Sequence, residues 1–552
     1  MDELSYTNIK RALIAGIFLI FIIFLLIIRL FFIQVVKSQD YSKKAVQQRL
    51  MNISLGTDRG NIYDRNLIPF TAREKKKYII IYPAYIQDIT NTSALISKAT
   101  GLSPEYISNR IKAAKKPLEF LYTSEENEYF DTIEKGKLKG VIIIEKKQRY
   151  SESSLCRHLI GYISKADKKG EMGIEKSMDS YLTGGNSGVI AVVDSSKNII
   201  PGLGFRKVEG NLGKLSIKLT LDYHIQKITE DILKKYNLNG SIIVMDIKTG
   251  DILAMSSYPD FDQNNVQNYI YSHGEELINK GVWAYDLGSV FKTVVTAAAL
   301  ENENFDIFKK YLCKGSIDIG NITIQCSTHK THENKELTIQ DAFALSCNTA
   351  FVKIGMEIGE EAILDMAKKF GFGEKLCFEL FEEKPGYIPK PKEEGIANIS
   401  IGQGKIQVTP LQVTSMMATI ANNGISMNPR LVDELINDDG VTIKKIEKIK
   451  PKTVISSSTA FVLKEMLRRV TIQGTGKAAN IDELGGSSGK TGTAETGINF
   501  GKVTHGWFSG FIPSIEPQYA ITVFINDGKS GGSYAAPIFK EVAEEILYKI
   551  KR

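Results

Sequence analysis

A serine and a lysine three positions apart, Ser289 and Lys292, have the types and spacing needed for nucleophilic catalysis. A serine hydroxyl is a poor nucleophile until a neighbouring base takes its proton, and a buried lysine whose charged form is disfavoured can act as that base. Residues i and i+3 at the start of a helix share a face, so the amine of Lys292 should lie beside the hydroxyl of Ser289. The pair predicts acyl transfer through a covalent serine intermediate.

The S-x-x-K pattern is short, and Ser487 with Lys490 fits it as well. The setting favours Ser289 as the nucleophile. Gly288 supplies a loose turn before it, and residues 290–300 form an apolar run that can be helical. The sequence therefore predicts a serine and its base at the start of a buried helix.

A second motif, Ser346-Cys347-Asn348, follows a helix-like stretch at 337–345. A hydroxyl and an amide two positions apart can work together on the wall of a site. The hydroxyl can relay a proton, and the amide can hold a peptide carbonyl group. We expect Ser346 and Asn348 to face the nucleophile.

A third motif, Lys490-Thr491-Gly492-Thr493, follows a glycine-rich stretch at 485–489. A lysine attracts a substrate carboxylate, and the two threonine hydroxyls can bond to the same group. Residues 248–250 repeat the Lys-Thr-Gly letters inside an expected hairpin turn upstream of Ser289, so we interpret that copy as structural.

The three motifs, in this order, resemble those of penicillin-binding proteins and class A β-lactamases, with Cys347 standing where the pattern has aspartate. Residues 59–66 (RGNIYDRN) resemble the juxtamembrane motif of class B penicillin-binding proteins, and residues 402–412 and 506–511 are similar to further stretches of that family. The resemblance covers nearly the whole chain. It implies an α/β (α+β) penicillin-binding transpeptidase domain, similar to serine β-lactamases, behind an elongated mixed α+β pedestal domain.

The resemblance also implies roles for the motif residues. Ser289 would be acylated by the D-Ala-D-Ala end of a peptidoglycan stem peptide, with Lys292 as its base. Ser346 would carry the proton to the leaving D-alanine and Asn348 would orient the substrate. The terminal carboxylate would be held by Lys490, Thr491, Gly492 and Thr493, and the N–H groups of Ser289 and Thr493 would form the oxyanion hole.

The implied function is a penicillin-sensitive D,D-transpeptidase of bacterial cell-wall synthesis, which needs no cofactor for its chemistry. Its implied partners are stem peptides, β-lactam antibiotics, the membrane and a polytopic glycosyltransferase of the shape, elongation, division and sporulation type, with no nucleic acid. A D,D-carboxypeptidase is the nearest alternative; a membrane-bound β-lactamase and a non-catalytic β-lactam sensor are the others. An elongation, division or sporulation role stays open.

A cysteine and histidine cluster is not explained by the three motifs. Cys313, Cys326, His329 and His332 lie within twenty residues and could bind a structural zinc ion. If only one histidine binds, Asp286 is the carboxylate expected to complete a set of four, where it would brace the catalytic helix. A Cys313–Cys326 disulfide is the alternative, because an extracytoplasmic site is oxidising.

The elements that hold these motifs begin with an anchor. Residues 12–28 are seventeen apolar residues in a row, followed by Arg29 and a further apolar stretch, which is enough to span a bilayer. No small-residue cleavage site follows, so we expect an uncleaved helix. The sequence predicts a cytoplasmic head at 1–11, a transmembrane anchor at 12–36, an extracytoplasmic pedestal at 37–235 and a transpeptidase domain at 236–552.

Periodicity predicts the secondary structure of the last domain. Two apolar runs at 241–246 and 251–255 indicate a β-hairpin. Helices are expected at 293–300, 360–370, 410–421 and 458–470, a strand at 518–525 and a closing helix at 537–550. This order favours an antiparallel sheet covered by helices. The net charge of +7 is spread along the chain and does not form a nucleic-acid-binding stripe.

Overall fold

The computed structural model describes residues 3–41, 50–115, 117–123, 138, 140–192, 205–208, 213–320, 322–495, 503–526 and 530–550. The chain forms two compact units, each assembled from separate stretches of sequence. Unit 1 comprises residues 1–58, 75–147 and 185–212, and unit 2 comprises residues 59–74, 148–184 and 213–552. The chain therefore passes from one unit to the other several times before the catalytic motifs begin.

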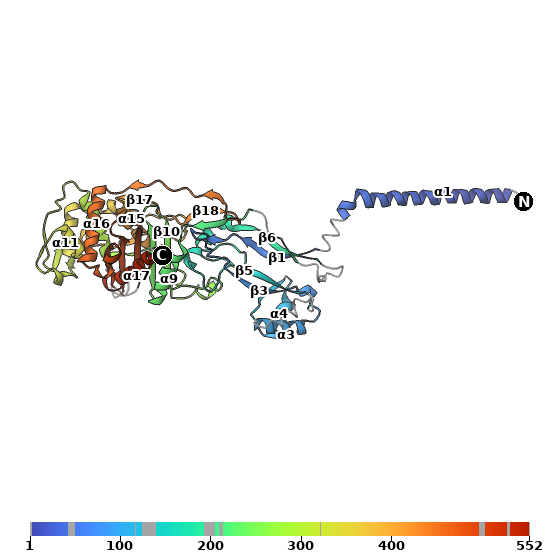
Figure 1. The fold of residues 1–552 in the computed structure, drawn as a ribbon, viewed down its shortest axis with the longest axis horizontal. Helices are drawn as coiled ribbons and strands as arrows, with labels where there is room; N and C mark the ends of the chain where they lie inside the picture. The colour runs from blue at the N-terminus through green and yellow to red at the C-terminus, as the bar shows by residue number, and fades with distance from the viewer. Residues whose placement is uncertain are drawn as a thin grey trace. The chain divides into compact units, whose positions relative to one another are not determined.

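Unit 1 begins with helix α1 (Glu3–Phe31), which continues into a π-helical turn at Phe32–Val36 (Figure 1). Within it, Ile9–Val36 is long and apolar enough to cross a membrane. Its apolar side chains are exposed and do not pack against protein. In the part of the chain that the structure describes, no other helix meets the same criterion of length and composition.

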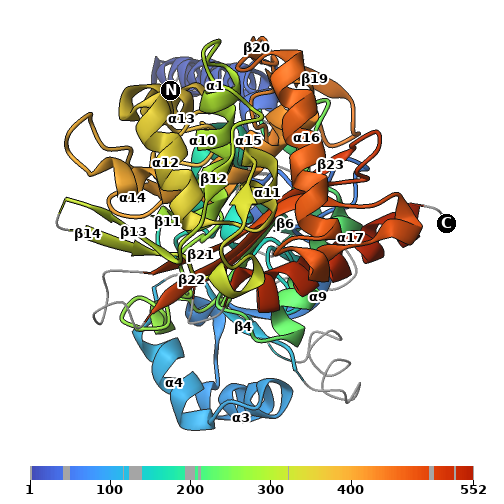
Figure 2. The ribbon, with the colours of Figure 1, turned by 90° about the vertical axis from the view of Figure 1, so that its left-hand side faces the viewer.

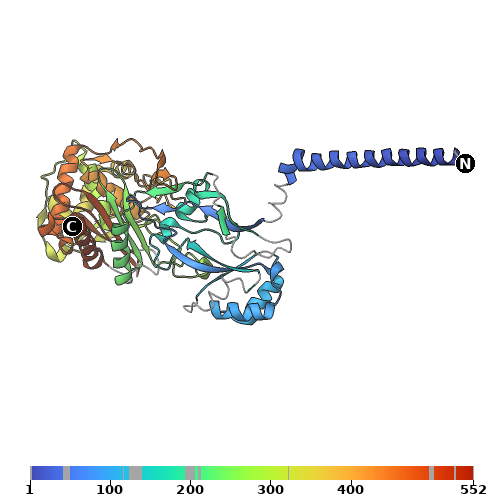
Figure 3. The ribbon, with the colours of Figure 1, turned by 45° about the vertical axis from the view of Figure 1, so that its right-hand side comes forward.

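The rest of unit 1 is built from two small sheets and two helices. Strands β3 (Glu74–Ile81), β4 (Leu118–Leu121) and β5 (Val141–Gln148) pair in the order β4-β3-β5, and β1 (Leu50–Arg59), β6 (Thr183–Val192) and β7 (Phe205–Val208) in the order β1-β6-β7. Helices α3 (Ile89–Thr100) and α4 (Pro104–Ala113) lie beside each other (Figure 3). Asp88 and Ser103 cap them by accepting backbone N–H groups.

Unit 2 is organised around a five-stranded antiparallel sheet in the order β10-β9-β23-β22-β21. Its strands are β9 (Gly240–Asp246), β10 (Ile252–Tyr258), β21 (Ser488–Glu495), β22 (Thr504–Ile512) and β23 (Tyr519–Ile525). The first two form the predicted hairpin, with the Lys-Thr-Gly copy at 248–250 in its turn. Strand β21, which carries the third motif, is at the edge of the sheet.

Helices cover both faces of this sheet (Figure 2). Alternate residues of β9 belong to different cores: Ile242 and Val244 pack with α9 (Tyr223–Lys235) and α17 (Ala536–Ile550), whereas Ile243 and Met245 face the larger core. That core contains α10 (Lys292–Leu300), α12 (Asn348–Ile358), α15 (Pro410–Ala421) and α16 (Ser457–Ile472). The strand is buried on both faces and is therefore apolar throughout, which explains the unbroken hydrophobic run.

Shorter elements complete unit 2. The helices are α6 (Arg157–Ile160), α7 (Gly173–Ser177), α8 (Asp179–Leu182), α11 (Ile339–Ala344), α13 (Glu360–Lys369) and α14 (Ile396–Ile401). A second sheet has the order β19-β18-β8-β2, with β19 (Thr442–Lys445), β18 (Val432–Ile436), β8 (Ser216–Leu219) and β2 (Ile62–Tyr63). Two-stranded pairs are β11 (Tyr285–Asp286) with β16 (Gln407–Val408), β12 (Tyr311–Leu312) with β15 (Glu336–Leu337), β13 (Ser316–Ile319) with β14 (Ile322–Gln325), and β17 (Ile425–Ser426) with β20 (Lys452–Thr453).

The RGNIYDRN segment has a structural role in unit 2. Glu175 is fully buried and its carboxylate accepts hydrogen bonds from Arg59 Nε at 2.6 Å and Arg149 Nε at 2.7 Å. Burial alone would raise the pKa of Glu175, but the charges of Arg149 and Arg59 outweigh it and lower that pKa. Asp64 accepts the N–H group of Tyr223 at 3.1 Å and so connects the segment to the start of α9.

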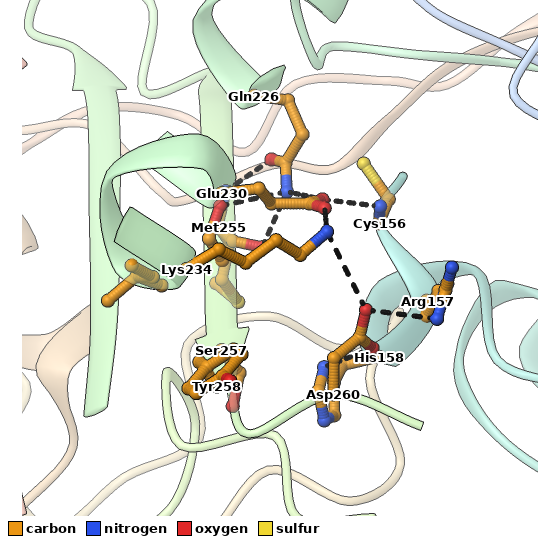
Figure 4. A pocket seen from close by; sticks show the side chains of 12 residues that line it. Cys156, Arg157, His158, Gln226, Glu230, Lys234, Met255, Ser257, Tyr258 and Asp260 are labelled. Atoms are coloured by element: carbon orange, nitrogen blue, oxygen red, sulfur yellow. Dashed lines mark hydrogen bonds and ion pairs between the residues drawn. The ribbon is translucent and has the colours of Figure 1, made fainter. Parts of the chain in front are cut away.

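A second buried polar cluster joins α6 to α9 (Figure 4). Glu230 accepts the N–H group of Cys156 at 2.6 Å and the side-chain amide of Gln226 at 2.9 Å. Asp260 pairs with Arg157 at 3.3 Å. The cavity between these groups is about 10 Å³, which is room for about one water molecule, so the cluster braces the fold and does not bind a larger ligand.

Candidate active site

The nucleophile lies on a tight turn between β11 and α10. Gly288 has φ of +63°, and a Cβ atom there would lie 2.6 Å from the carbonyl oxygen of Thr493. Its N–H group donates to Gly402 O at 3.0 Å. Glycine is therefore required at this position for two reasons, its backbone conformation and the close approach of β21. The next residue, Ser289, is half-buried.

Ser289 and Lys292 are brought together by a 3₁₀ turn. Residues Gly288–Phe291 form this turn, and the α-helix begins at Lys292, one residue before the helix expected at 293–300, so Ser289 lies on the turn and not on the helix itself. With three residues per turn, side chains at i and i+3 stack on one another. Lys292 Nζ consequently lies 2.7 Å from Ser289 Oγ.

Lys292 is fully buried and connects the first two motifs. Its Nζ also lies 2.7 Å from Asn348 Oδ1 and 3.4 Å from Ser346 Oγ. Burial lowers the pKa of the Lys292 ammonium to about 8, against a smaller opposing effect of the nearby Cys347 and Cys326 thiols. A lysine with this pKa is partly neutral near pH 7 and can accept the proton of a serine hydroxyl.

The second motif occupies the connection between two helices. Helix α11 ends at Ala344, Ser346 takes a left-handed conformation with φ of +56°, and Cys347 precedes α12, which begins at Asn348. The left-handed residue reverses the chain and directs both polar side chains towards Lys292. The Asn348 amide donates in addition to Gln325 O at 2.9 Å, so its orientation is held from two sides.

The third motif lies on the edge strand β21, whose register places Lys490 opposite Ser509 and Thr493 opposite Gly506. Lys490 is fully buried, and burial together with the charge of Lys292 lowers its pKa. Thr493 is exposed, whereas Thr491 is buried and bonds to Thr475 Oγ1 at 2.6 Å. An edge strand next to a nucleophile can pair with an extended peptide.

Gly492 lies where β21 passes close to the nucleophile turn. A Cβ atom at Gly492 would lie 2.9 Å from both Leu287 O and Val290 Cγ2. The missing side chain therefore lets the turn that carries the nucleophile pack closely against β21. The competing serine, Ser487, is buried and donates to Ala479 O at 2.6 Å, which is a structural contact.

The cysteine and histidine residues form a compact cluster beside the second motif. The ligand atoms of Cys313, Cys326, His332 and Cys347 all lie within 4.8 Å of one another, and all four residues are buried. Cys326 Sγ is 3.6 Å from His332 Nε2 and 3.8 Å from Cys347 Sγ. The hydrogen bond between the two sulfur atoms lowers the pKa of Cys326 and raises that of Cys347.

Of the other residues considered for this cluster, His329 contacts it from the side and Asp286 lies away from it; the alternative Cys313–Cys326 disulfide is not formed. His329 Nδ1 lies 3.4 Å from Cys313 Sγ, beside the cluster, and the Asp286 carboxylate lies 3.9 Å from His505 Nδ1. All five cysteines of the chain, each of which the structure describes, are free thiols. Sequence spacing could not find Cys347 as a member, because it is separated from the other three and was already explained as part of the S-x-N motif.

Other residues of the site were missed by sequence reasoning. Gln325 contributes a backbone oxygen, which no side-chain pattern reports. Trp507 Nε1 donates to Asp286 O at 2.9 Å and holds the segment before the nucleophile, although residues 506–511 had been noted only for their family resemblance. These contacts depend on strands that are distant in sequence.

Comparisons with known proteins agree with this geometry. Residues 240–544 match the family of penicillin-binding protein transpeptidase domains, and residues 55–211 match the penicillin-binding protein dimerisation domain. Stage V sporulation protein D of Bacillus subtilis (strain 168) is 29% identical over 98% of this chain and 85% of its own length. Peptidoglycan D,D-transpeptidase FtsI of Escherichia coli (strain K12) is 25% identical over 99% of this chain and 92% of its own.

Solved structures share the fold. Penicillin-binding protein 3 of Mycobacterium tuberculosis, solved in complex with ampicillin, superposes with a TM-score of 0.65 at 23% identity over 91% of this chain and 96% of that one. The transpeptidase family match covers more than half of the 552 residues and includes all three motifs. The chain therefore belongs to the penicillin-binding proteins, with a dimerisation domain ahead of a transpeptidase domain.

Proposed function

We propose that this protein cross-links peptidoglycan as a D,D-transpeptidase, with Ser289 as the nucleophile and Lys292 as its base. Members of this family are serine-type acyltransferases that need no cofactor. The observation that carries the assignment is the position of Lys292 Nζ, 2.7 Å from Ser289 Oγ and within 3.4 Å of Ser346 Oγ. One buried amine thus contacts both hydroxyls that the reaction requires.

In the first half-reaction, Ser289 Oγ attacks the carbonyl carbon of the penultimate D-alanine of a donor stem peptide, and its proton passes to Lys292 Nζ. The developing oxyanion is stabilised by the N–H groups of Ser289 and Thr493, each donor contributing about 3 kcal/mol in comparable sites. Ser346 then delivers a proton to the leaving nitrogen as the C–N bond breaks, and it receives in turn the proton held by Lys292, whose Nζ lies 3.4 Å from Ser346 Oγ. Terminal D-alanine departs, and the acyl group stays on Ser289.

In the second half-reaction, the amine of an acceptor stem peptide attacks the carbonyl carbon of the acyl-enzyme, and Lys292 takes the proton that the amine loses. The ester C–O bond to Ser289 then breaks, and Lys292 returns the proton to Ser289 Oγ, 2.7 Å away, as the cross-linked peptide departs. We assign Asn348 to orient the donor peptide, and Thr491, Gly492 and Thr493 with Lys490 to the strand that binds its C-terminal end. Because Lys490 is fully buried, we assign the direct contact with the carboxylate to the exposed Thr493.

Two further parts of the proposal concern the setting of the enzyme. The helix at Ile9–Val36 supports a single membrane span, with residues 1–11 in the cytoplasm, 37–235 as a pedestal and 236–552 as the extracytoplasmic transpeptidase domain. The family is one of extracytoplasmic cell-wall enzymes. We further infer a polytopic glycosyltransferase as the partner that makes the glycan strands, because the two family matches are a dimerisation domain and a transpeptidase domain, and neither polymerises glycan.

Mass spectrometry and product analysis test the reaction. The purified chain is incubated with a fluorescent penicillin and digested, and the penicilloyl adduct should be found on the peptide that contains Ser289. With a stem pentapeptide and an acceptor amine, the same protein should release D-alanine and form the cross-linked product. An adduct on Ser487 would contradict the assignment, and D-alanine release with hydrolysed donor alone would favour the D,D-carboxypeptidase.

We also propose a structural zinc ion in the cluster of Cys313, Cys326, His332 and Cys347. Tetrahedral zinc with Zn–S of about 2.3 Å and Zn–N of about 2.1 Å places two sulfur ligands about 3.8 Å apart and a sulfur and a nitrogen about 3.6 Å apart. The distances around Cys326 are 3.8 Å and 3.6 Å. His332 Nδ1 is bonded to Thr331 Oγ1 at 3.1 Å, which leaves Nε2 directed at the cluster.

Such an ion would hold the S-x-N motif in place, because Cys347 lies between Ser346 and Asn348. Metal analysis of the purified chain should find about one zinc per molecule, and Cys313→Ser or Cys326→Ser should lose it, together with a lower melting temperature. Cys156→Ser, at a buried cysteine outside the cluster, should keep the metal. Wild-type protein without metal would refute the proposal and leave the serine chemistry intact.

A further inference from the structure

Asp286 and His505 meet behind the nucleophile, at the joint between two structural elements. Asp286 ends strand β11 three residues before Ser289, and His505 lies on β22. The nearest atoms of the two side chains, Asp286 Oδ2 and His505 Nδ1, are 3.9 Å apart. His505 is 5% exposed, and its Nδ1 has no hydrogen-bond partner among the described residues.

This contact is important because the two proposed oxyanion donors come from the two elements that it connects. The N–H group of Ser289 belongs to the nucleophile turn, and that of Thr493 belongs to β21. His505 is paired in register with Ala494, the residue after Thr493. Asp286 precedes the turn that carries the Ser289 N–H group, and His505 lies on β22, which pairs with the strand that carries the Thr493 N–H group. The Asp286–His505 contact therefore connects the two elements that supply the oxyanion donors.

Neighbouring contacts hold the segment before Ser289 from other sides. Trp507 Nε1 donates to the backbone oxygen of Asp286 at 2.9 Å, which holds the main chain against β22. Asp286 is paired with Gln407 of β16 on the opposite side. The absent side chain of Gly288 lets the turn approach Thr493 O. The Asp286 carboxylate and the His505 imidazole differ from these contacts, because their separation of 3.9 Å is too long for a hydrogen bond.

The surroundings of His505 are mainly aromatic. The ring lies edge-on to Tyr285 of β11 and Phe524 of β23, with centroids at 5.3 Å and 5.5 Å. Two more polar groups face the ring, the backbone of Asp286 and the side chain of Asn526, whose amide donates to Glu275 at 3.2 Å. Burial lowers the pKa of His505 and raises that of Asp286, so it disfavours the charged form of each group. A hydrogen bond between the two side chains would give the buried Nδ1 of His505 a partner.

We propose that Asp286 and His505 act as a positioning pair, which closes to a hydrogen bond when substrate enters and sets the distance between the Ser289 turn and strand β21. This inference rests on the proposed function, because the rate that it concerns is acylation of Ser289. Neither side chain touches the reacting atoms. The pair acts through the geometry of the oxyanion hole, where a displacement of about 1 Å can lower a rate on the order of 100-fold.

The prediction is a loss of acylation rate without a loss of binding. Asp286→Asn and His505→Gln keep size and polarity but weaken the contact, and each should lower the first-order acylation constant for a fluorescent penicillin about tenfold. The pre-covalent dissociation constant should change less than about twofold. The double variant should be no slower than the slower single variant, because both substitutions remove one shared contact.

The measurement is a stopped-flow or quenched-flow series over penicillin concentration, which separates the dissociation constant from the acylation constant. Because only folded molecules are acylated, the rate constant does not depend on the fraction of protein that folds. His224→Gln, at an exposed histidine on α9, is the matched control and should react like the wild type. Three results would contradict the role of the Asp286–His505 pair: unchanged acylation constants in the single variants, additive losses in the double variant, or a change in the dissociation constant alone. A wild type that is not acylated would instead refute the proposed function.

Discussion

Ser289→Ala should abolish covalent labelling by fluorescent penicillin, with a loss of acylation rate of at least about 1,000-fold. The hydroxyl of Ser289 is the one that Lys292 Nζ approaches at 2.7 Å, and alanine leaves no atom that can form the ester bond. The remaining site can still bind the antibiotic without reacting. Labelling is measured by gel fluorescence and by the intact mass of the protein.

Two controls make this result specific. Ser487→Ala changes the other serine that fits S-x-x-K. This variant should still be labelled, because the Ser487 hydroxyl is buried and donates a hydrogen bond to Ala479 O at 2.6 Å. A thermal unfolding curve of Ser289→Ala should overlay that of the wild type, since a half-buried hydroxyl is lost without leaving a cavity. Persistent labelling of Ser289→Ala would mean that another residue is the nucleophile.

Lys292→Ala should lower acylation of Ser289 about 100- to 10,000-fold, the usual effect of removing a general base. Lys292→Arg should not restore the rate, because a guanidinium group does not release its proton in this pH range. Both variants keep Ser289, so slow labelling at long incubation times distinguishes them from Ser289→Ala. Labelling of Lys292→Ala at the wild-type rate would exclude Lys292 as the base.

The pH dependence of the wild type follows from the same residue. Burial lowers the pKa of Lys292 to about 8, and the neutral amine is the form that accepts the serine proton. The neutral fraction is about one in ten at pH 7 and about nine in ten at pH 9, so the acylation constant should rise about tenfold over this interval and then level off. Lys292→Ala should lack this rise. A wild-type rate that falls from pH 7 to pH 9 would contradict the assignment.

Much of the fold could be predicted from local patterns. The hairpin of β9 and β10, the helices α13, α15 and α16, and the closing helix α17 were predicted within about three residues, because the apolar pattern of each element follows from the side that it buries in the core. Helix α10 starts within one residue of the expected 293–300, but the 3₁₀ turn at Gly288–Phe291, which carries Ser289, was not predicted. The close packing of the turn against β21 favours a 3₁₀ geometry there, and a sequence pattern does not contain that distant contact.

The sequence by itself determined the catalytic motifs, their order and the apolar anchor, because these depend on residue type and on spacing along the chain. Only the tertiary structure decided which groups meet: Lys292 joins Ser289 to Asn348, Cys347 joins the cysteine cluster, and Asp286 pairs with His505 and not with that cluster. The physical reason is that each of these contacts spans elements brought together by the packing of α10, α12 and β22 in one core, where separation along the chain no longer sets distance.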